Sequence, residues 1–268
     1  MSRTTFGDQL REWRRVRGLS QLELASQGEV SQRHISFIES GRSRPSREMV
    51  LHLGDVLEIP PREQNLLLTA AGHAPAFAET PLDRLDQIAD VLEFMLGAHE
   101  PNVAIVVDRQ WNVVRANAAA TSLVTTLLPD APPALVQSLN VMRLSFHPDG
   151  FRRHMTAWAA TAAALLRRLE RDAASYPNDE GLHNLVDEIR GYPDVDSLPR
   201  ALPGAGAADL LVPVTYRIGG DDLSFFTTIA IIGDAHDLTL AELRLETFWP
   251  MDRESATRWN RLVADGDR

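Results

Sequence analysis

The fold of the N-terminal part follows from SQLELASQGEVSQRHISFIESGRSRPS, residues 20–46. Ser20 and Glu23 have the spacing of a capping box, in which the hydroxyl accepts from an amide and the carboxylate reaches back. The apolar residues that follow predict a short helix, which Gly28 ends. Ser31 then caps another short helix. Two short helices joined by a tight turn indicate a helix-turn-helix, whose second helix can enter the major groove of DNA.

The second of these helices has two faces of different chemistry. Val30, Ile35 and Ile38 recur at helical spacing, so we expect them in the core. The other positions then face away from the core, and Gln and Arg at such positions can form paired hydrogen bonds with a purine. The candidate base-contacting residues are Gln32, Arg33, Ser36 and Phe37. Further candidate DNA contacts lie beside them, among them loop arginines that can reach phosphates: Gln21, Ser31, Arg42 and Arg44.

Helix signals continue on both sides of this stretch. An apolar series before it runs at helical spacing until Gly18. After it, Pro45-Ser46 starts a fourth helix and Pro60-Pro61 starts a fifth, which runs to Gly72. The sequence therefore predicts a five-helix domain over residues 1–72. A small helical bundle that serves protein contacts is the alternative interpretation.

Charge is distributed unevenly along the chain. Residues 1–47 contain nine Arg and five acidic residues, a net charge of +4, whereas the whole chain carries -10. A basic head on an acidic body suggests that only the head meets a polyanion. The chain contains no Cys, which excludes disulfides and thiolate metal sites. Because it shows neither a bilayer-spanning apolar run nor an apolar signal segment, we expect a cytoplasmic protein without a membrane partner.

The N-terminal segment resembles the lambda-repressor-like (Cro/C1, XRE) DNA-binding domain over roughly residues 5–72. The matches are LREWRRVRGLSQLELA, VSQRHISFIESGRSRPS and MVLHLGDVLEIP. The resemblance implies that Gln21, Gln32, Arg33, Ser36 and Arg42 contact a double-stranded DNA operator. Phe37 occupies a position where many relatives have a polar base-contacting residue, which leaves a thymine-methyl contact and simple packing both open. Arg14 and Glu39 match a pair that is structural in the family.

Residues 73–84, HAPAFAETPLDR, have the composition of a linker, and we place a second domain at 85–268. Its segment VAIVVDRQWNVVRANAAATSLV, residues 103–124, predicts strand, turn, strand and helix. This order resembles the opening of a PAS fold. With a helix-turn-helix before it and NVMRLSFHPDGFRRHM at 140–155, the chain resembles the MmyB-like regulators. The expected fold class is α+β in two domains, the second a PAS-like antiparallel sheet with flanking helices.

A mixed sheet flanked by helices tends to leave a cavity, which we expect to bind a small hydrophobic ligand. The family resemblance implies the same, with fatty-acid-like ligands. The candidate lining residues are Phe94, Trp111, Met142, Leu144, Phe151, Trp158 and Phe226. His154 is a candidate partner for a carboxylate head group. A core position is the alternative for each aromatic residue.

Catalytic motifs are absent: the sequence has no GxxxxGK[ST], HExxH or GxSxG. We therefore expect no enzyme, no metal site and no cofactor beyond an apolar ligand. The hypothesis is a sequence-specific, ligand-sensing transcription regulator, and a homodimer, because a single unit of this kind reads only a half-site. The alternatives are a C-terminal domain that acts as an enzyme or as an interaction module for a partner protein.

Overall fold

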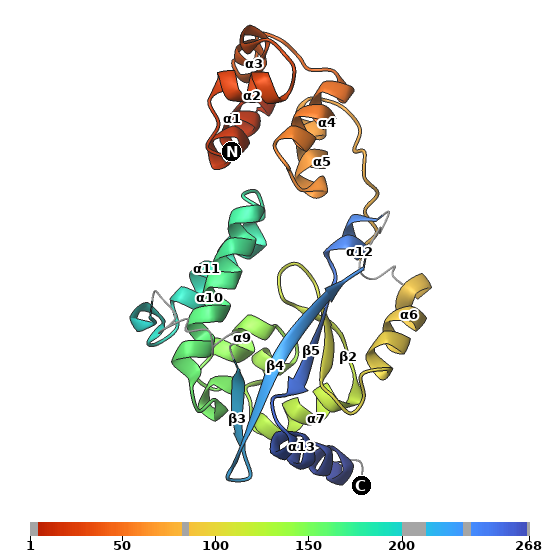
Figure 1. Ribbon diagram of the computed structural model, residues 1–268, viewed down its shortest axis with the longest axis vertical. Helices are drawn as coiled ribbons and strands as arrows, with labels where there is room; N and C mark the ends of the chain where they lie inside the picture. Colours follow the sequence, from red (N-terminus) through yellow and green to blue (C-terminus); the bar gives the residue numbers. More distant parts are fainter. Residues whose placement is uncertain (1–4, 82–85, 200–212, 233–236, 267–268) are drawn as a thin grey trace. The chain divides into compact units, whose positions relative to one another are not determined.

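The computed structural model describes residues 5–81, 86–199, 213–232 and 237–266 of the 268-residue chain (Figure 1). The chain forms two compact units. The first comprises Met1–Thr80 with His236–Leu238, and the second comprises Pro81–Ala235 with Thr239–Arg268. No helix in the described ranges has the length and apolar character needed to cross a membrane.

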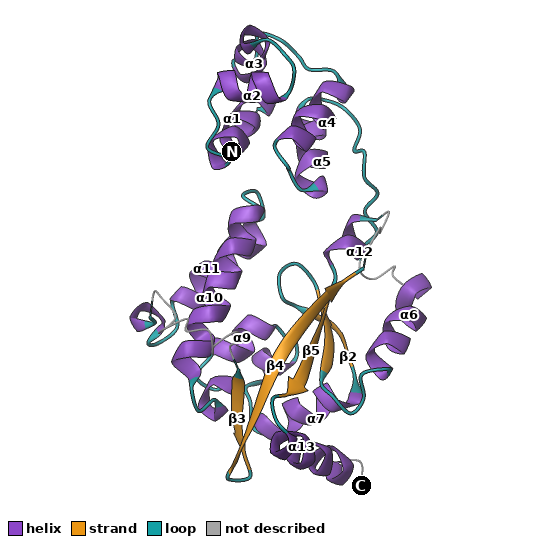
Figure 2. Ribbon diagram, in the orientation of Figure 1, coloured by secondary structure: helices purple, strands orange, loops and turns teal. Residues whose placement is uncertain are grey.

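The first unit contains the five helices that the sequence predicts (Figure 2). They are α1 (Phe6–Val16), α2 (Gln21–Gln27), α3 (Gln32–Glu39), α4 (Arg47–Val56) and α5 (Pro61–Ala70). Each of the first four begins at a hydroxyl residue that accepts a hydrogen bond from a backbone amide of the first turn. The caps are Thr5, Ser20, Ser31 and Ser46. The capping box of Ser20 and Glu23 is confirmed, with both of its hydrogen bonds present.

Close packing of α1 against α3 organises this unit. A Cβ added at Gly7 would lie 2.5 Å from the backbone oxygen of Glu39 and 2.9 Å from that of Ile38. Only glycine lets the two helices approach so closely. Leu10 and Trp13 of α1 are buried in the same core as Ile35 and Ile38 of α3.

The segment after α5 remains attached to the first unit. The side chain of Asn65 accepts from the amides of Ala76 and Phe77 and donates to the carbonyl of Phe77. The amide of Leu238 donates to the carbonyl of Ala78 over 2.9 Å. The first unit therefore extends to Thr80, past the start of the linker that the sequence suggests at residue 73.

The second unit is built on a five-stranded antiparallel sheet in the order β2-β1-β5-β4-β3, and its fold is PAS-like. The strands are β1 (Ala104–Val107), β2 (Val113–Ala116), β3 (Val214–Ile218), β4 (Asp221–Ile231) and β5 (Arg244–Pro250). The longer helices are α6 (Asp86–Gly97), α7 (Ala118–Leu127), α10 (Trp158–Ser175), α11 (Glu180–Arg190) and α13 (Arg253–Gly266). The short ones are α8 (Pro133–Val136), α9 (Val141–Phe146), α12 (Leu238–Glu242) and the 3-10 turns Phe151–His154 and Val195–Ser197.

Both faces of the sheet are covered. Ala104 and Val106 of β1 pack in one apolar cluster with Leu92 and Leu96 of α6. Their neighbours along the chain point to the other face, because successive strand side chains alternate. That second cluster, which includes Ile105, also contains residues of α7, α9, α10 and α13. Helices therefore flank the sheet on both faces, as the sequence predicts (Figure 2).

Candidate DNA-binding surface and ligand cavity

Helix α3 has an aliphatic face and a polar face. Ile35 and Ile38 are 0% and 1% exposed, whereas Gln32 and Arg33 are exposed. The predicted orientation of the helix is thus confirmed. Gly28 ends α2, and Glu29 completes the turn with a φ of 50°, in the left-handed region. The hydroxyl of Ser31 accepts from the amide of His34 over 3.1 Å, so this predicted contact residue serves as the cap of α3.

Phe37 holds two arginines on this surface. The guanidinium carbon of Arg33 lies 5.0 Å from the centroid of the Phe37 ring, and that of Arg42 lies 6.0 Å from it. Such cation–π contacts fix long side chains that would otherwise sample many rotamers. Phe37 and Ser36 are half-buried, and Arg42 is exposed. In this structure Phe37 packs against Arg33 and Arg42, and its contact with a thymine methyl group stays a prediction.

A buried acid links α3 to the helices behind it. Glu39 is 3% exposed, and its carboxylate accepts from Arg14 over 2.6 and 3.0 Å and from Gln21 over 2.8 Å. Burial alone would raise the pKa of Glu39, but the hydrogen bonds from Arg14 and Gln21 outweigh it and lower that pKa. The expected pair of Arg14 and Glu39 is present. Gln21, predicted as a DNA contact, donates its side-chain amide to Glu39 within the domain.

Arg44, predicted to contact phosphate, forms hydrogen bonds within the first unit. Its guanidinium donates to the carbonyls of Ala71 over 2.8 Å and Gly72 over 3.1 Å. It therefore ties the loop after α3 to the C-terminal end of α5, where unpaired carbonyls attract a cation. Sequence spacing could not reveal this contact, because its partners lie about 27 residues further along the chain.

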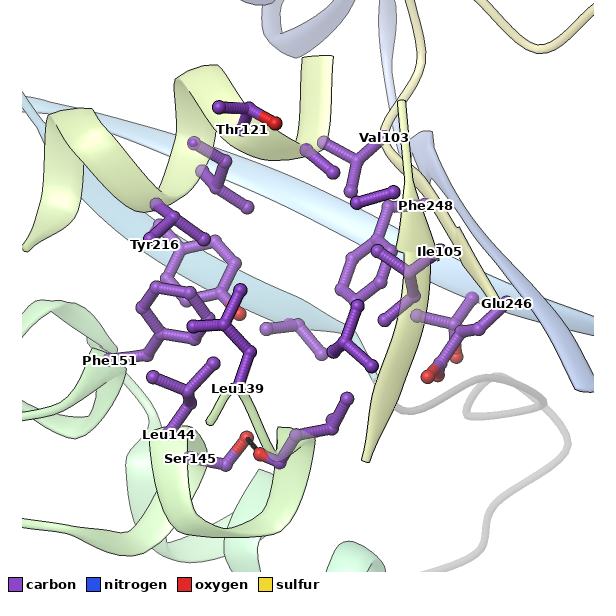
Figure 3. Close-up of a pocket in the computed structure, with 18 of the residues that line it drawn as sticks. Val103, Ile105, Thr121, Leu139, Leu144, Ser145, Phe151, Tyr216, Glu246 and Phe248 are labelled. Atoms are coloured by element: carbon purple, nitrogen blue, oxygen red, sulfur yellow. Dashed lines mark hydrogen bonds between the residues drawn. The ribbon is translucent and has the colours of Figure 1, made fainter. Parts of the chain in front are cut away.

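The second unit encloses an apolar cavity of about 160 Å3 between the sheet and α7, α9 and α10 (Figure 3). Carbon atoms form most of its wall. The lining residues are Val103, Ile105, Val113, Ala116, Ala120, Thr121, Leu123, Val124, Thr125, Leu139, Val141, Leu144, Ser145, Phe151, Met155, Leu165, Val214, Tyr216, Thr227, Glu246 and Phe248. Because Ala116, Thr121 and Thr125 are exposed, the cavity opens to solvent beside α7.

Two family matches account for both units. Residues 88–262 match the MmyB-like transcription regulator ligand binding domain, and residues 5–67 match a helix-turn-helix domain. The chain belongs to the MmyB-like transcription regulators. It is also similar to an uncharacterized HTH-type transcriptional regulator, RghRB, of Bacillus subtilis (strain 168), with 43% identity over 75 residues. That similarity covers 28% of this chain and 52% of the relative, so the chain spans about half the relative's length.

The cavity of this MmyB-like regulator contains two of the eight residues predicted to bind the ligand, Leu144 and Phe151. Phe94 is 78% exposed, because Leu92 and Leu96 turn the opposite face of α6 to the sheet. Phe226 pairs with Trp249 of β5. Its neighbour Thr227 lines the cavity. Because successive side chains of a strand point to opposite faces, Phe226 points away from the cavity.

The remaining predicted lining residues have structural roles outside the cavity wall. Trp111 is fully buried and donates to Asp172 over 3.1 Å, and Met142 is fully buried in the main core. Trp158 donates to the carbonyl of Ser145 over 3.0 Å. His154 lies beside Arg153, and burial followed by that positive charge lowers its pKa, which disfavours a cationic partner for a ligand carboxylate. The alternative interpretation, core packing, holds for both tryptophans.

Several polar residues of the MmyB-like cavity were missed by sequence reasoning. Tyr216 and Glu246 lie in its wall although both are at most 3% exposed. Burial raises the pKa of Glu246 above its ordinary value. In the strand RLETFWP, residues 244–250, the acid lies between Leu245 and Thr247, and all three residues are buried. An acid in such a strand merits notice, because charged residues are almost never fully buried without a partner.

Proposed function

We propose that this MmyB-like regulator acts in the cytoplasm, where it binds a double-stranded DNA operator through α3 and the following loop. A small hydrophobic ligand in the cavity changes that affinity. DNA binding is supported by the two faces of α3: Ile35 and Ile38 are buried, whereas Gln32 and Arg33 face solvent. In this proposal Gln32, Arg33 and Ser36 contact base edges, and Arg42 contacts phosphate. The protein acts as a homodimer, because one such unit reads only a half-site.

The cavity sets the size of the ligand. An engineered protein cavity of about 150 Å3 holds benzene, so a cavity of about 160 Å3 suits a ligand of roughly six to ten non-hydrogen atoms. A longer, fatty-acid-like chain would extend through the opening beside Thr121 and Thr125. The wall favours apolar molecules because nearly all of it is carbon (Figure 3). The ligand shifts DNA binding only by its difference in affinity for the two states of the regulator.

A sensor accounts for this site better than an enzyme does. Among the described lining residues, the hydroxyls of Thr121, Thr125 and Ser145 each donate to a backbone carbonyl of their own helix. None of these three pairs with a base that would activate it as a nucleophile. The lining hydroxyl of Thr227 hydrogen-bonds to the buried carboxyl of Glu246.

The test combines identification of the ligand with DNA titration. Native mass spectrometry of the purified full chain identifies small molecules that co-purify, and fluorescence anisotropy then measures affinity for operator DNA with and without each of them. We expect a several-fold change in DNA affinity at saturating ligand, with the ligand recovered unchanged. The variant Val124→Trp fills the cavity and should abolish this response, whereas Thr126→Trp, exposed on the same helix, should preserve it. Product formation would favour an enzyme, and an unchanged DNA affinity would contradict the sensor.

A further inference from the structure

Phe37 is an apolar residue of α3 that lies outside the apolar core. Among the described residues, neither the buried core cluster of the first unit nor the half-buried layer packed against it contains Phe37. Its side chain is half-buried and follows the exposed Arg33 by four residues. Residues four apart on a helix share a face, so Phe37 lies on the outer face of α3 together with Arg33. Core packing therefore does not explain a phenylalanine at this position.

The end of α3 holds Phe37 in a defined position. Its carbonyl accepts from the amides of Arg42 over 2.8 Å and Ser43 over 3.2 Å, and from the hydroxyl of Ser40 over 3.2 Å. The guanidinium carbons of Arg33 and Arg42 lie 5.0 and 6.0 Å from the centroid of its ring. An apolar surface that is already ordered in the free protein can contact a partner with little further loss of entropy.

The arginine beside the ring keeps its hydrogen-bond donors available. In the described parts of the chain, no residue accepts a hydrogen bond from the guanidinium of Arg33 or forms an ion pair with it. Such a guanidinium can donate to O6 and N7 of a guanine in the major groove. Bases stack about 3.4 Å apart along a strand, so a ring 5.0 Å from that guanidinium lies within about two base pairs of the guanine. In the major groove the apolar group on a base edge is the 5-methyl of thymine.

We propose that Phe37 determines specificity: its ring contacts the 5-methyl group of a thymine within about two base pairs of a guanine that Arg33 binds. Apolar contact with this methyl group distinguishes thymine from the other bases. A cytosine at the same place would turn its amino group to a ring that cannot accept a conventional hydrogen bond, and an unpaired buried donor is unfavourable. This inference rests on the proposed DNA-binding function and adds one residue and one base to it.

The test replaces thymine by uracil, which lacks only the 5-methyl group. The full-length protein first enriches a motif from a random pool of DNA duplexes. Fluorescence anisotropy then measures its affinity for that motif with uracil at each thymine in turn. At one thymine per half-site the affinity should fall about fourfold, the loss expected for one buried methyl group. This thymine should lie within about two base pairs of the guanine whose preference Arg33→Ala removes.

Phe37→Ala should bind the thymine and uracil duplexes with equal affinity. Leu66→Ala is the matched control, since it removes an exposed apolar side chain from α5 and should keep the fourfold difference.

A ring that only orders the two arginines would leave the unaltered protein insensitive to uracil near that guanine. This insensitivity, a motif without thymine there, or a uracil effect that persists in Phe37→Ala overturns the inference, while DNA binding itself stands. If Phe37→Ala fails to fold, the uracil scan of the unaltered protein decides. If the full-length protein enriches no motif, the proposed DNA-binding function fails as well.

Discussion

At the scale of single residues, Phe37 shows how an apolar side chain can serve a polar surface. The contacts of its ring with Arg33 and Arg42 hold both guanidinium groups before DNA arrives. Ordering two long side chains in advance removes part of the entropy loss on binding. We therefore expect Phe37→Ala to weaken operator binding about three- to tenfold, since each cation–π contact contributes about 0.5–1 kcal/mol. Fluorescence anisotropy with a labelled operator duplex measures the loss.

Phe37→Tyr is the matched control, because a tyrosine ring keeps both cation–π contacts. It should bind operator nearly as tightly as the unaltered protein. Urea denaturation of each variant separates a loss of fold from a loss of DNA contact. Equal affinity of Phe37→Ala and the unaltered protein would show that the ring does not position the two arginines.

At the scale of elements, α3 is held against α1 and α2 by Glu39. Because bonds from Arg14 and Gln21 lower the pKa of Glu39, this carboxylate stabilises the folded unit above its ordinary pKa of 4.5. That stabilisation is lost as pH falls through the lowered pKa. We expect Glu39→Gln to reduce the free energy of unfolding by about 2–3 kcal/mol at pH 7, because Arg14 loses its charged partner.

The pH dependence of that difference is the measurement. Peptide-resolved hydrogen exchange over α1 and α3 should show a stability gap between Glu39→Gln and the unaltered protein at neutral pH. The gap should shrink as pH falls below about 4.5. Glu58→Gln is a suitable control, since Glu58 is exposed just after α4. A gap independent of pH would mean that ionisation of Glu39 does not stabilise the first unit.

The same scale shows what sequence could and could not predict. Caps and helical periodicity are local signals, and they predicted all five helices of the first unit and the orientation of α3. The cavity depends on which strand face meets which helix, a relation between distant segments. Large aromatic residues such as Trp111 were therefore assigned to the cavity although they fill the core, while Tyr216 and Glu246 were missed. Composition favours large apolar residues as lining, but a cavity persists where side chains leave space.

At the scale of the whole molecule, positive charge is concentrated in the helix-turn-helix part and negative charge in the rest of the chain. Residues 1–47 carry a net +4 in a chain of net -10, so attraction to DNA is confined to the segment that contains α3. We expect the acidic remainder of the chain to repel DNA. Family membership in both parts, with a helix-turn-helix match at 5–67 and the ligand-binding match at 88–262, agrees with this division.

Selection of binding sites from a random pool of DNA duplexes tests the central claim, that the polar face of α3 reads base edges. The unaltered protein should enrich one motif, and Arg33→Ala should lose the preference for one base pair within each half-site, a discrimination of about 1–3 kcal/mol. Arg253→Ala, which removes an exposed arginine of the ligand domain, should enrich the original motif. Enrichment of that same motif by Arg33→Ala with undiminished preference at every position would contradict the account.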